Sequence, residues 1–149
     1  MPKTVSTGDP RGDLTGALAL AGTEVRQKYG SSLNFERLQV LLQDRSVVKY
    51  PCEMVFDSRP LLAGEFAHTM RRGLAPEDGF IIYVHPSLHK EQTHLPYIVL
   101  HQLPAVNLNG LASPDQAEEF GSSALGLSRE SYYQKLCEIA GHVGGDDLV

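Results

Sequence analysis

Four of the six histidines of this chain lie within seventeen positions, at His85, His89, His94 and His101. Imidazole is the commonest metal ligand in proteins and the side chain that gains or loses a proton near neutral pH. A metal centre or acid–base chemistry is therefore expected first in this stretch. The candidate metal ligands are His85, His94 and His101, together with Glu118 in a later segment.

The spacing of these histidines limits what they can bind. Two ligands on one helix must lie three or four residues apart to reach one ion. His94 and His101 are seven residues apart, which is about 10 Å along a helix axis. His85 and His89 have a suitable spacing only if residues 85–89 are helical, and Pro86 is equally compatible with a strand end. In the alternative, structural interpretation, His85 ends a strand, His89 is exposed, and His101 is a hydrogen-bonded histidine in the core.

Resemblance to a known family is carried by the segment Val99-Leu100-His101-Gln102-Leu103-Pro104-Ala105-Val106. It resembles the active-site helix of the zincin metalloproteases, whose motif is His-Glu-x-x-His after apolar residues. In that family a later helix can supply an acidic third ligand. The resemblance covers roughly residues 80–125 and implies a zincin-like scaffold. It places His101 at the first zinc ligand and Glu118 or Glu119 at the third.

Three residues depart from the zincin motif. Gln102 occupies the position of the general base and cannot take a proton from water. Ala105 occupies the position of the second histidine, and Pro104 interrupts the segment. Without the base and one ligand, the motif lacks the machinery for metal-activated hydrolysis. We therefore expect no cofactor, zinc being the one candidate that the resemblance raises.

The remaining reactive side chains give weaker signals. Cys52 and Cys137 are expected to be free, buried and inert thiols. Glu118 and Glu119 are expected early in a helix, where they interact favourably with its N-terminus. The sequence contains no Gly-x-Gly-x-x-Gly or Walker-type loop, so a nucleotide cofactor is not expected.

The composition excludes several classes of partner. A net charge of −5, with no basic run longer than two residues, argues against nucleic acid. No run of about 18 apolar residues is present, so no membrane-spanning segment is predicted. The N-terminus lacks the pattern of a signal peptide. These features predict a cytoplasmic protein whose partner is an unknown protein or small molecule.

The hydrophobic periodicity defines the elements that must position these residues. Amphipathic helices are expected at 14–29 and after Asn34. Strands are expected around 48–56, with Pro51 indicating a sheet edge, and at 80–84 as an interior strand covered on both faces. Residues 60–71 fit either a strand or one face of a helix, and a strand is favoured. A helix from Leu95 should end or kink at Pro104. Two more should follow a capping box at Ser113 and a cap at Ser128, the last stopping at Gly141 or Gly144.

These elements predict an α+β fold in which a small sheet of about three strands packs against about five helices. Residues 14–143 are expected to form one globular domain, residues 1–13 a flexible arm and residues 144–149 a flexible tail. The leading hypothesis is a non-catalytic binding or interaction module on a zincin-like scaffold. One alternative is a metal-dependent hydrolase that uses His101 with other histidines. Another is a subunit of a larger assembly, which requires an exposed apolar patch.

Overall fold

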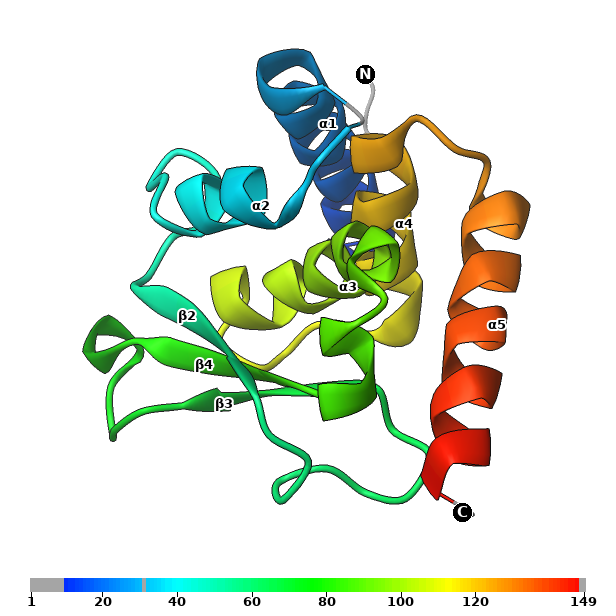
Figure 1. The fold of residues 1–149 in the computed structure, drawn as a ribbon. Coiled ribbons are helices and arrows are strands. Elements are labelled where there is room, and N and C mark those ends of the chain that lie inside the picture. The colour runs from blue at the N-terminus through cyan, green and yellow to red at the C-terminus, as the bar shows by residue number, and fades with distance from the viewer. Residues whose placement is uncertain (1–9, 31, 148–149) are drawn as a thin grey trace, which may run out of the picture.

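The computed structural model describes residues 10–30 and 32–147. In this part of the chain, five α-helices and a three-stranded mixed sheet form the α+β fold that the sequence predicts (Figure 1). The α-helices and strands occur along the chain as α1 (Pro10–Tyr29), α2 (Phe35–Leu42), β2 (Cys52–Phe56), β3 (Ala67–Arg71), β4 (Phe80–Val84), α3 (Leu95–Asn107), α4 (Pro114–Leu125) and α5 (Arg129–Asp147).

The three strands are arranged in the order β2-β4-β3. The central strand β4 pairs in parallel with β2 and antiparallel with β3. The predicted edge position of the strand near Pro51 is confirmed, because β2 lies at one side of the sheet. Pro51 has no N–H to donate, and its carbonyl oxygen accepts a 2.8 Å hydrogen bond from the backbone of Phe80. The ambiguous segment 60–71 contributes the other edge strand, β3.

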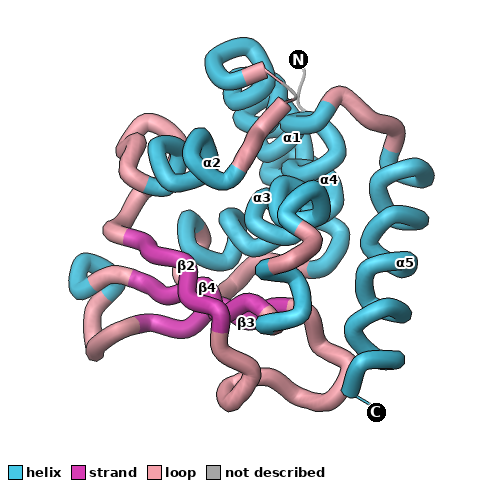
Figure 2. Tube along the Cα trace, in the orientation of Figure 1, coloured by secondary structure: helices cyan, strands magenta, loops and turns pink. Residues whose placement is uncertain are grey.

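The prediction that β4 is covered on both faces is wrong. Its residues alternate: Phe80, Ile82 and Val84 are buried, whereas Ile81 and Tyr83 are partly exposed. Figures 1 and 2 show α1 to α4 on one side of the sheet, α5 running past the end of the sheet, and the connection 57–66 passing on the other side. A continuous apolar run is typical of a strand buried on both faces. The sequence of β4 therefore did not indicate that one of its faces is partly exposed.

Helix α3 lies between the sheet and the remaining helices and is nearly all apolar. It continues to Asn107, so of the two predicted effects of Pro104, an end or a kink, the end is wrong. Pro104 removes one amide donor, but Leu103, Pro104 and Val106 are all buried. Their burial in the core stabilises the helical path, and the backbone of Leu108 donates to the carbonyl oxygen of Pro104 at 2.8 Å.

The predicted capping box of α4 is confirmed. The Ser113 hydroxyl accepts from the backbone of Gln116 at 3.1 Å, and the Gln116 side chain accepts from the backbone of Ser113 at 2.8 Å. Gly126 ends the helix in the left-handed conformation that glycine adopts without strain. Helix α1 packs closely along α4, because a Cβ on Gly22 would lie 2.6 Å from the carbonyl oxygen of Phe120.

The terminal helices are longer than expected. Helix α1 begins at Pro10, so residues 10–13 are helical rather than part of an arm. Helix α5 runs through Gly141 and Gly144 to Asp147, so residues 144–147 are also helical. The rest of the predicted arm and tail, residues 1–9 and 148–149, lies outside the described residues. No helix in the described part of the chain is long and apolar enough to span a bilayer.

Candidate functional site

His101 lies on α3 between two aromatic rings. Phe66 meets its imidazole edge-on with the ring centroids 6.0 Å apart, and Tyr132 of α5 stacks on it at 6.4 Å. Its Nδ1 is buried and has no hydrogen-bond partner among the described residues. Because burial disfavours the charged imidazolium, the pKa of His101 falls to about 4. At neutral pH the side chain is therefore an uncharged ring packed against aromatic neighbours.

The next residue, Gln102, is held by strand β3. The hydroxyl of Thr69 donates a 2.7 Å hydrogen bond to its amide oxygen. If the segment is aligned with the zincin motif that it resembles, Gln102 occupies the position of the general base. A carboxamide cannot serve as a general base. Ala105, one turn beyond His101, offers no ligand atom. On α3, therefore, neither the general base nor the second histidine of the motif is present.

His85 and His89 mark the two ends of a short 3₁₀ turn, Pro86–His89. The Nδ1 of His85 accepts from the backbone of Ser87 at 3.2 Å and lies 2.8 Å from its hydroxyl, so this imidazole caps the turn. His89 contacts the ring of Phe56 edge-on at 4.8 Å between centroids. Residues four apart do not align along a 3₁₀ helix, which has three residues per turn. The turn forms, but it does not pair these two imidazoles.

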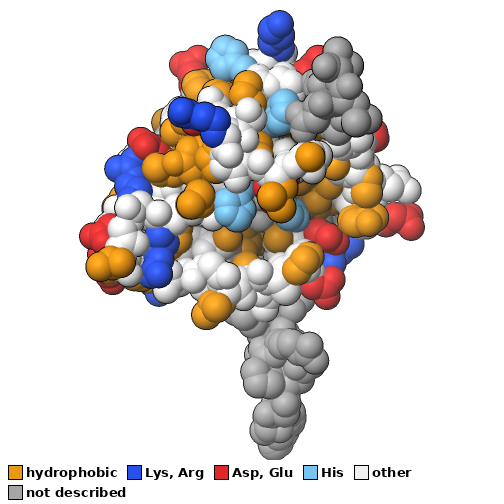
Figure 3. Space-filling view, turned by 90° about the horizontal axis from the view of Figure 1, so that it is seen from below, with side chains coloured by type: hydrophobic (Ala, Val, Ile, Leu, Met, Phe, Trp, Pro, Cys, Tyr) orange, Lys and Arg blue, Asp and Glu red, His pale blue; other side chains and the backbone are white. Residues whose placement is uncertain are grey.

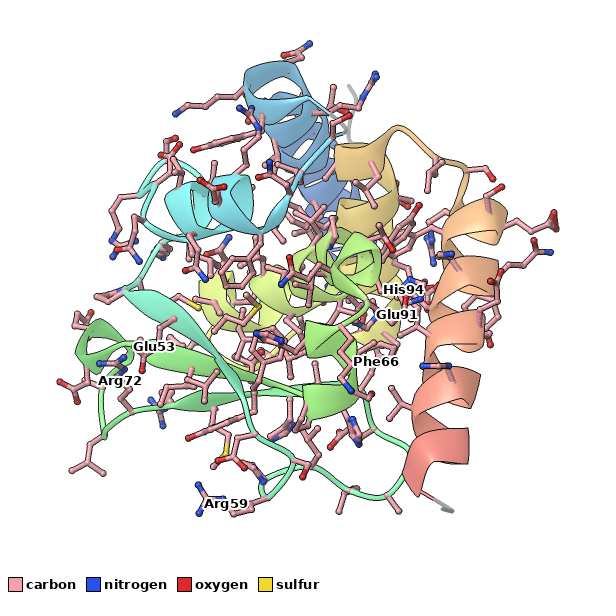
Figure 4. The ribbon with its side chains drawn as sticks, in the orientation of Figure 1. Glu53, Arg59, Phe66, Arg72, Glu91 and His94 are labelled. Atoms are coloured by element: carbon pink, nitrogen blue, oxygen red, sulfur yellow. The ribbon has the colours of Figure 1, made fainter. Side chains whose placement is uncertain are left out.

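His94 lies just before α3, near α5 (Figure 4). Its Nδ1 is buried without a hydrogen-bond partner in the described part of the chain. Burial lowers the pKa of His94, and the nearby ammonium of Lys135 lowers it further, whereas Glu91 opposes the shift. His94, like His101, is therefore mainly uncharged at neutral pH.

Glu118 serves an ion-pair cluster rather than a metal. Its carboxylate accepts from the guanidinium of Arg129 at 3.2 Å, and Glu119 and Asp115 accept from the same group at 3.0 and 2.8 Å. The expectation that Glu118 and Glu119 chiefly complement the start of their helix missed this contact. Arg129 begins α5, so the cluster joins the first turns of α4 and α5.

The four candidate ligands do not form a metal site. No group of three or more His, Cys, Asp or Glu side chains is placed to hold an ion within residues 10–30 and 32–147. His101 packs against the rings of Phe66 and Tyr132, His85 caps a turn, and Glu118 is engaged by Arg129. This set of donors does not fit the tetrahedral zinc centre that the resemblance implies.

The two cysteines differ in accessibility. Both are free thiols, Cys52 buried and Cys137 exposed. Burial raises the pKa of Cys52 to about 12, so its reactive thiolate form is suppressed. The prediction that Cys137 is buried is wrong, because on α5 the inward positions are Tyr132, Leu136 and Ile139.

A cavity of about 430 Å³ opens where α2, α3 and α4 meet. Its buried residues are Leu33, Pro96 and Leu125, and its walls include the partly buried rings of Phe35 and Tyr97. Exposed polar side chains complete the lining, namely Ser32, Asn34, Gln92 and Thr93. None of these nine residues is charged. Volumes of about 300–1,000 Å³ with an apolar lining are typical of small-molecule sites.

The elements that form this pocket fix its rings. Phe35 begins α2, and its ring stacks on Phe56 of β2 with centroids 6.3 Å apart. Tyr97 stacks on Tyr132 at 6.1 Å, and the ammonium of Lys135 lies 5.7 Å from its ring centroid. Both rings are held by neighbours outside the pocket, so the walls are in place before a ligand binds.

Sequence reasoning missed this pocket because its lining residues come from three separate segments, 32–35, 92–97 and Leu125. Individually, Phe35, Pro96 and Leu125 fit the apolar side of a helix, and Asn34 fits a cap. The side-chain oxygen of Asn34 does accept from the backbone of Arg37 at 2.8 Å, as that signal predicts. No local pattern records that the segments converge. Comparison of the chain with protein-family models, curated proteins and solved structures finds no match.

Proposed function

We propose that this protein is a non-catalytic binding module on a zincin-like scaffold, and that its pocket binds a small, uncharged, mainly apolar molecule. The observation that carries the proposal is the lining of the 430 Å³ pocket, which combines aromatic and aliphatic walls with neutral polar side chains. A charged ligand would lose its hydration there without gaining an opposite charge. An apolar ligand gains from burial, and its polar groups can bond to the amides and hydroxyls at the rim.

The non-catalytic part of the proposal is supported by α3. His101 is enclosed by Phe66 and Tyr132, and Gln102 stands where the resemblance would require a general base. The alternative, a metal-dependent hydrolase, would have to gather ligands that the described structure keeps in separate contacts. Elemental analysis of untagged protein tests that alternative. Stoichiometric zinc, iron or manganese would favour it over the binding module.

The pocket is tested by titrating the protein with Nile red, an uncharged dye that fluoresces in apolar surroundings. Gln92→Phe places a ring at the pocket rim, and Gln134→Phe places the same ring on an exposed position of α5. We expect saturable binding of one dye per chain, weakened at least about tenfold by Gln92→Phe, since the added ring fills the site. Gln134→Phe should bind as the wild type does.

Two outcomes would contradict the proposal: absence of saturable binding by the folded wild type, or equal weakening by both substitutions. Met70→Glu, on the open face of the sheet, is a second control for adsorption of dye outside the pocket. Circular dichroism establishes that each variant is folded. An uncharged ligand then remains to be identified by screening compounds that displace the dye.

A cytoplasmic location is part of the same proposal. It is supported by the two unpaired thiols, Cys52 and Cys137, because free cysteines are typical of reducing compartments. Fractionation of cells that produce the protein from its own gene tests the location.

A further inference from the structure

The side of the sheet that faces away from the helices carries an apolar strip. Strand register places two rows of side chains across this open face: Glu53, Ile81 and Met70 in one row, and Val55, Tyr83 and His68 in the next. The side chains that alternate with them, such as Ile82 and Ala67, are buried under the helices. Figure 3, the view from below, shows hydrophobic and histidine side chains interspersed over this side of the molecule.

The strip is more apolar than a solvent-facing sheet surface usually is. Val55, Ile81 and Tyr83 are partly exposed, and Met70 is 44% exposed. Antiparallel or mixed sheets with one solvated face normally carry polar residues at these positions. The apolar residues here form neighbouring pairs across three strands rather than isolated exceptions, which is typical of an interaction surface.

Opposite charges lie on the two edges of this strip. Glu53 belongs to the edge strand β2, and Arg72 directly follows the other edge strand, β3. The two side chains form an ion pair across β4, near the left end of the sheet in Figure 4. Their side chains are 50% and 42% exposed, respectively, so both charges remain accessible to another molecule.

From this arrangement we propose that the open sheet face pairs with the same face of a second copy of this chain. A two-fold axis parallel to β4 superposes β2 of one copy on β3 of the other. Glu53 of each copy then faces Arg72 of the other while the apolar strips meet. An axis across the strands would instead stack β2 on β2 and β3 on β3, so that Glu53 of one copy would not face Arg72 of the other.

The remaining charges around the strip are compatible with this pairing. Arg59 neutralises Asp57 through a 2.7 Å contact, and the carboxylate of Glu65 lies 3.8 Å from the imidazole of His68. Glu53 and Arg72 therefore decide the orientation. Since three short strands offer a small surface, the dimer is a weak one that forms at high protein concentration.

The dimer is tested by sedimentation equilibrium over a wide range of protein concentration. We expect the average mass of the wild type to rise toward twice the chain mass. Met70→Glu should raise the dimer dissociation constant at least about tenfold, because it buries a charge in the apolar strip. Leu20→Glu is the matched control: Leu20 is 63% exposed on α1, away from the sheet, and its substitution should leave the constant unchanged.

The orientation is tested by reversing one charge at a time. Glu53→Lys and Arg72→Glu should each dimerise at least about tenfold more weakly than the wild type, and an equimolar mixture should form a heterodimer of near wild-type affinity. A monomeric wild type at all concentrations would overturn the proposal, as would equal effects of Met70→Glu and Leu20→Glu. Failure of the mixture to restore affinity would overturn the β2-over-β3 arrangement.

Discussion

The hydroxyl of Tyr132 donates a 2.6 Å hydrogen bond to the carbonyl oxygen of Tyr97. This contact joins α5 to the first turn of α3, beside the stacked rings of the same two residues. Tyr132 also stacks on His101, so one buried side chain supports both the pocket wall and the enclosed histidine. His101 and the pocket thus share one structural support.

Tyr132 reaches this position because α4 carries a glycine beside it. A Cβ on Gly121 would overlap the hydroxyl end of the Tyr132 ring. Gly121→Ala should therefore lower the free energy of unfolding by about 1–3 kcal/mol, although alanine is the better helix former. Urea denaturation measures the change.

The control for this substitution is Gly141→Ala on α5, where no heavy atom lies within 4 Å of an added Cβ. It should raise the free energy of unfolding by up to about 1 kcal/mol through helix propensity alone. Equal effects at Gly121 and Gly141 would show that the tyrosine contact is not tight.

Arg129 should contribute more to the free energy of unfolding than an ordinary surface arginine does. It donates to three carboxylates and joins the first turns of α4 and α5. Arg129→Gln should lower the free energy of unfolding by about 1–2 kcal/mol, because it leaves three partly clustered negative charges without a counterion. Thermal unfolding at neutral pH measures the loss, which added salt should reduce.

Arg59→Gln provides the comparison for that substitution. Its side chain is 89% exposed and forms an ion pair with Asp57. Exposed pairs contribute little, so the expected change lies within about 0.5 kcal/mol. If Arg59→Gln lowers the free energy of unfolding as much as Arg129→Gln does, the ion-pair cluster on α4 and α5 stabilises the protein no more than an exposed ion pair.

The fold was predictable where local chemistry determines an element. The Ser113 capping box favours a helix start through its own hydrogen bonds, and Pro51 favours a sheet edge because it has no N–H to donate. Tertiary packing explains the failures. Burial of the residues around Pro104 keeps α3 helical through the proline, and the open face beneath Ile81 could not be read from a continuous apolar run.

The candidate site was less predictable than the fold. Spacing excluded a joint role for His94 and His101, because it depends only on helix geometry. The partners of each residue are contributed by distant segments: Phe66 and Tyr132 at His101, and Arg129 at Glu118. The pocket likewise depends on how three separate segments meet, which no local pattern specifies.

The two thiols should differ sharply in reactivity. Cys137 is exposed, whereas Cys52 is buried with a pKa of about 12. Ellman's reagent at neutral pH should therefore modify one thiol rapidly and the second only after denaturant is added. Cys137→Ser should remove the rapid phase and Cys52→Ser the slow one. Two rapid phases in the native protein would contradict the burial of Cys52.

Acid should destabilise the protein through His101. Its pKa is about 4 in the folded state, whereas the unfolded chain has the ordinary histidine pKa of 6.5. Between these values the unfolded chain binds a proton that the folded chain does not, so stability falls as pH falls from about 6.5 to 4. The largest effect expected from this shift is about 3 kcal/mol, reached below pH 4. His94 contributes in the same direction, because its pKa is also lowered.

His101→Phe separates this contribution from the rest. Phenylalanine preserves an aromatic ring between Phe66 and Tyr132 and removes both the titrating group and the unpaired Nδ1. Stability at pH 7 should be equal to or above that of the wild type, and the loss between pH 6.5 and 4 should become clearly smaller. His68→Gln, which removes an imidazole that is 47% exposed, is the control for loss of a histidine outside the core. An unchanged profile in His101→Phe would mean that His101 titrates normally and that its enclosure by the two rings is incomplete.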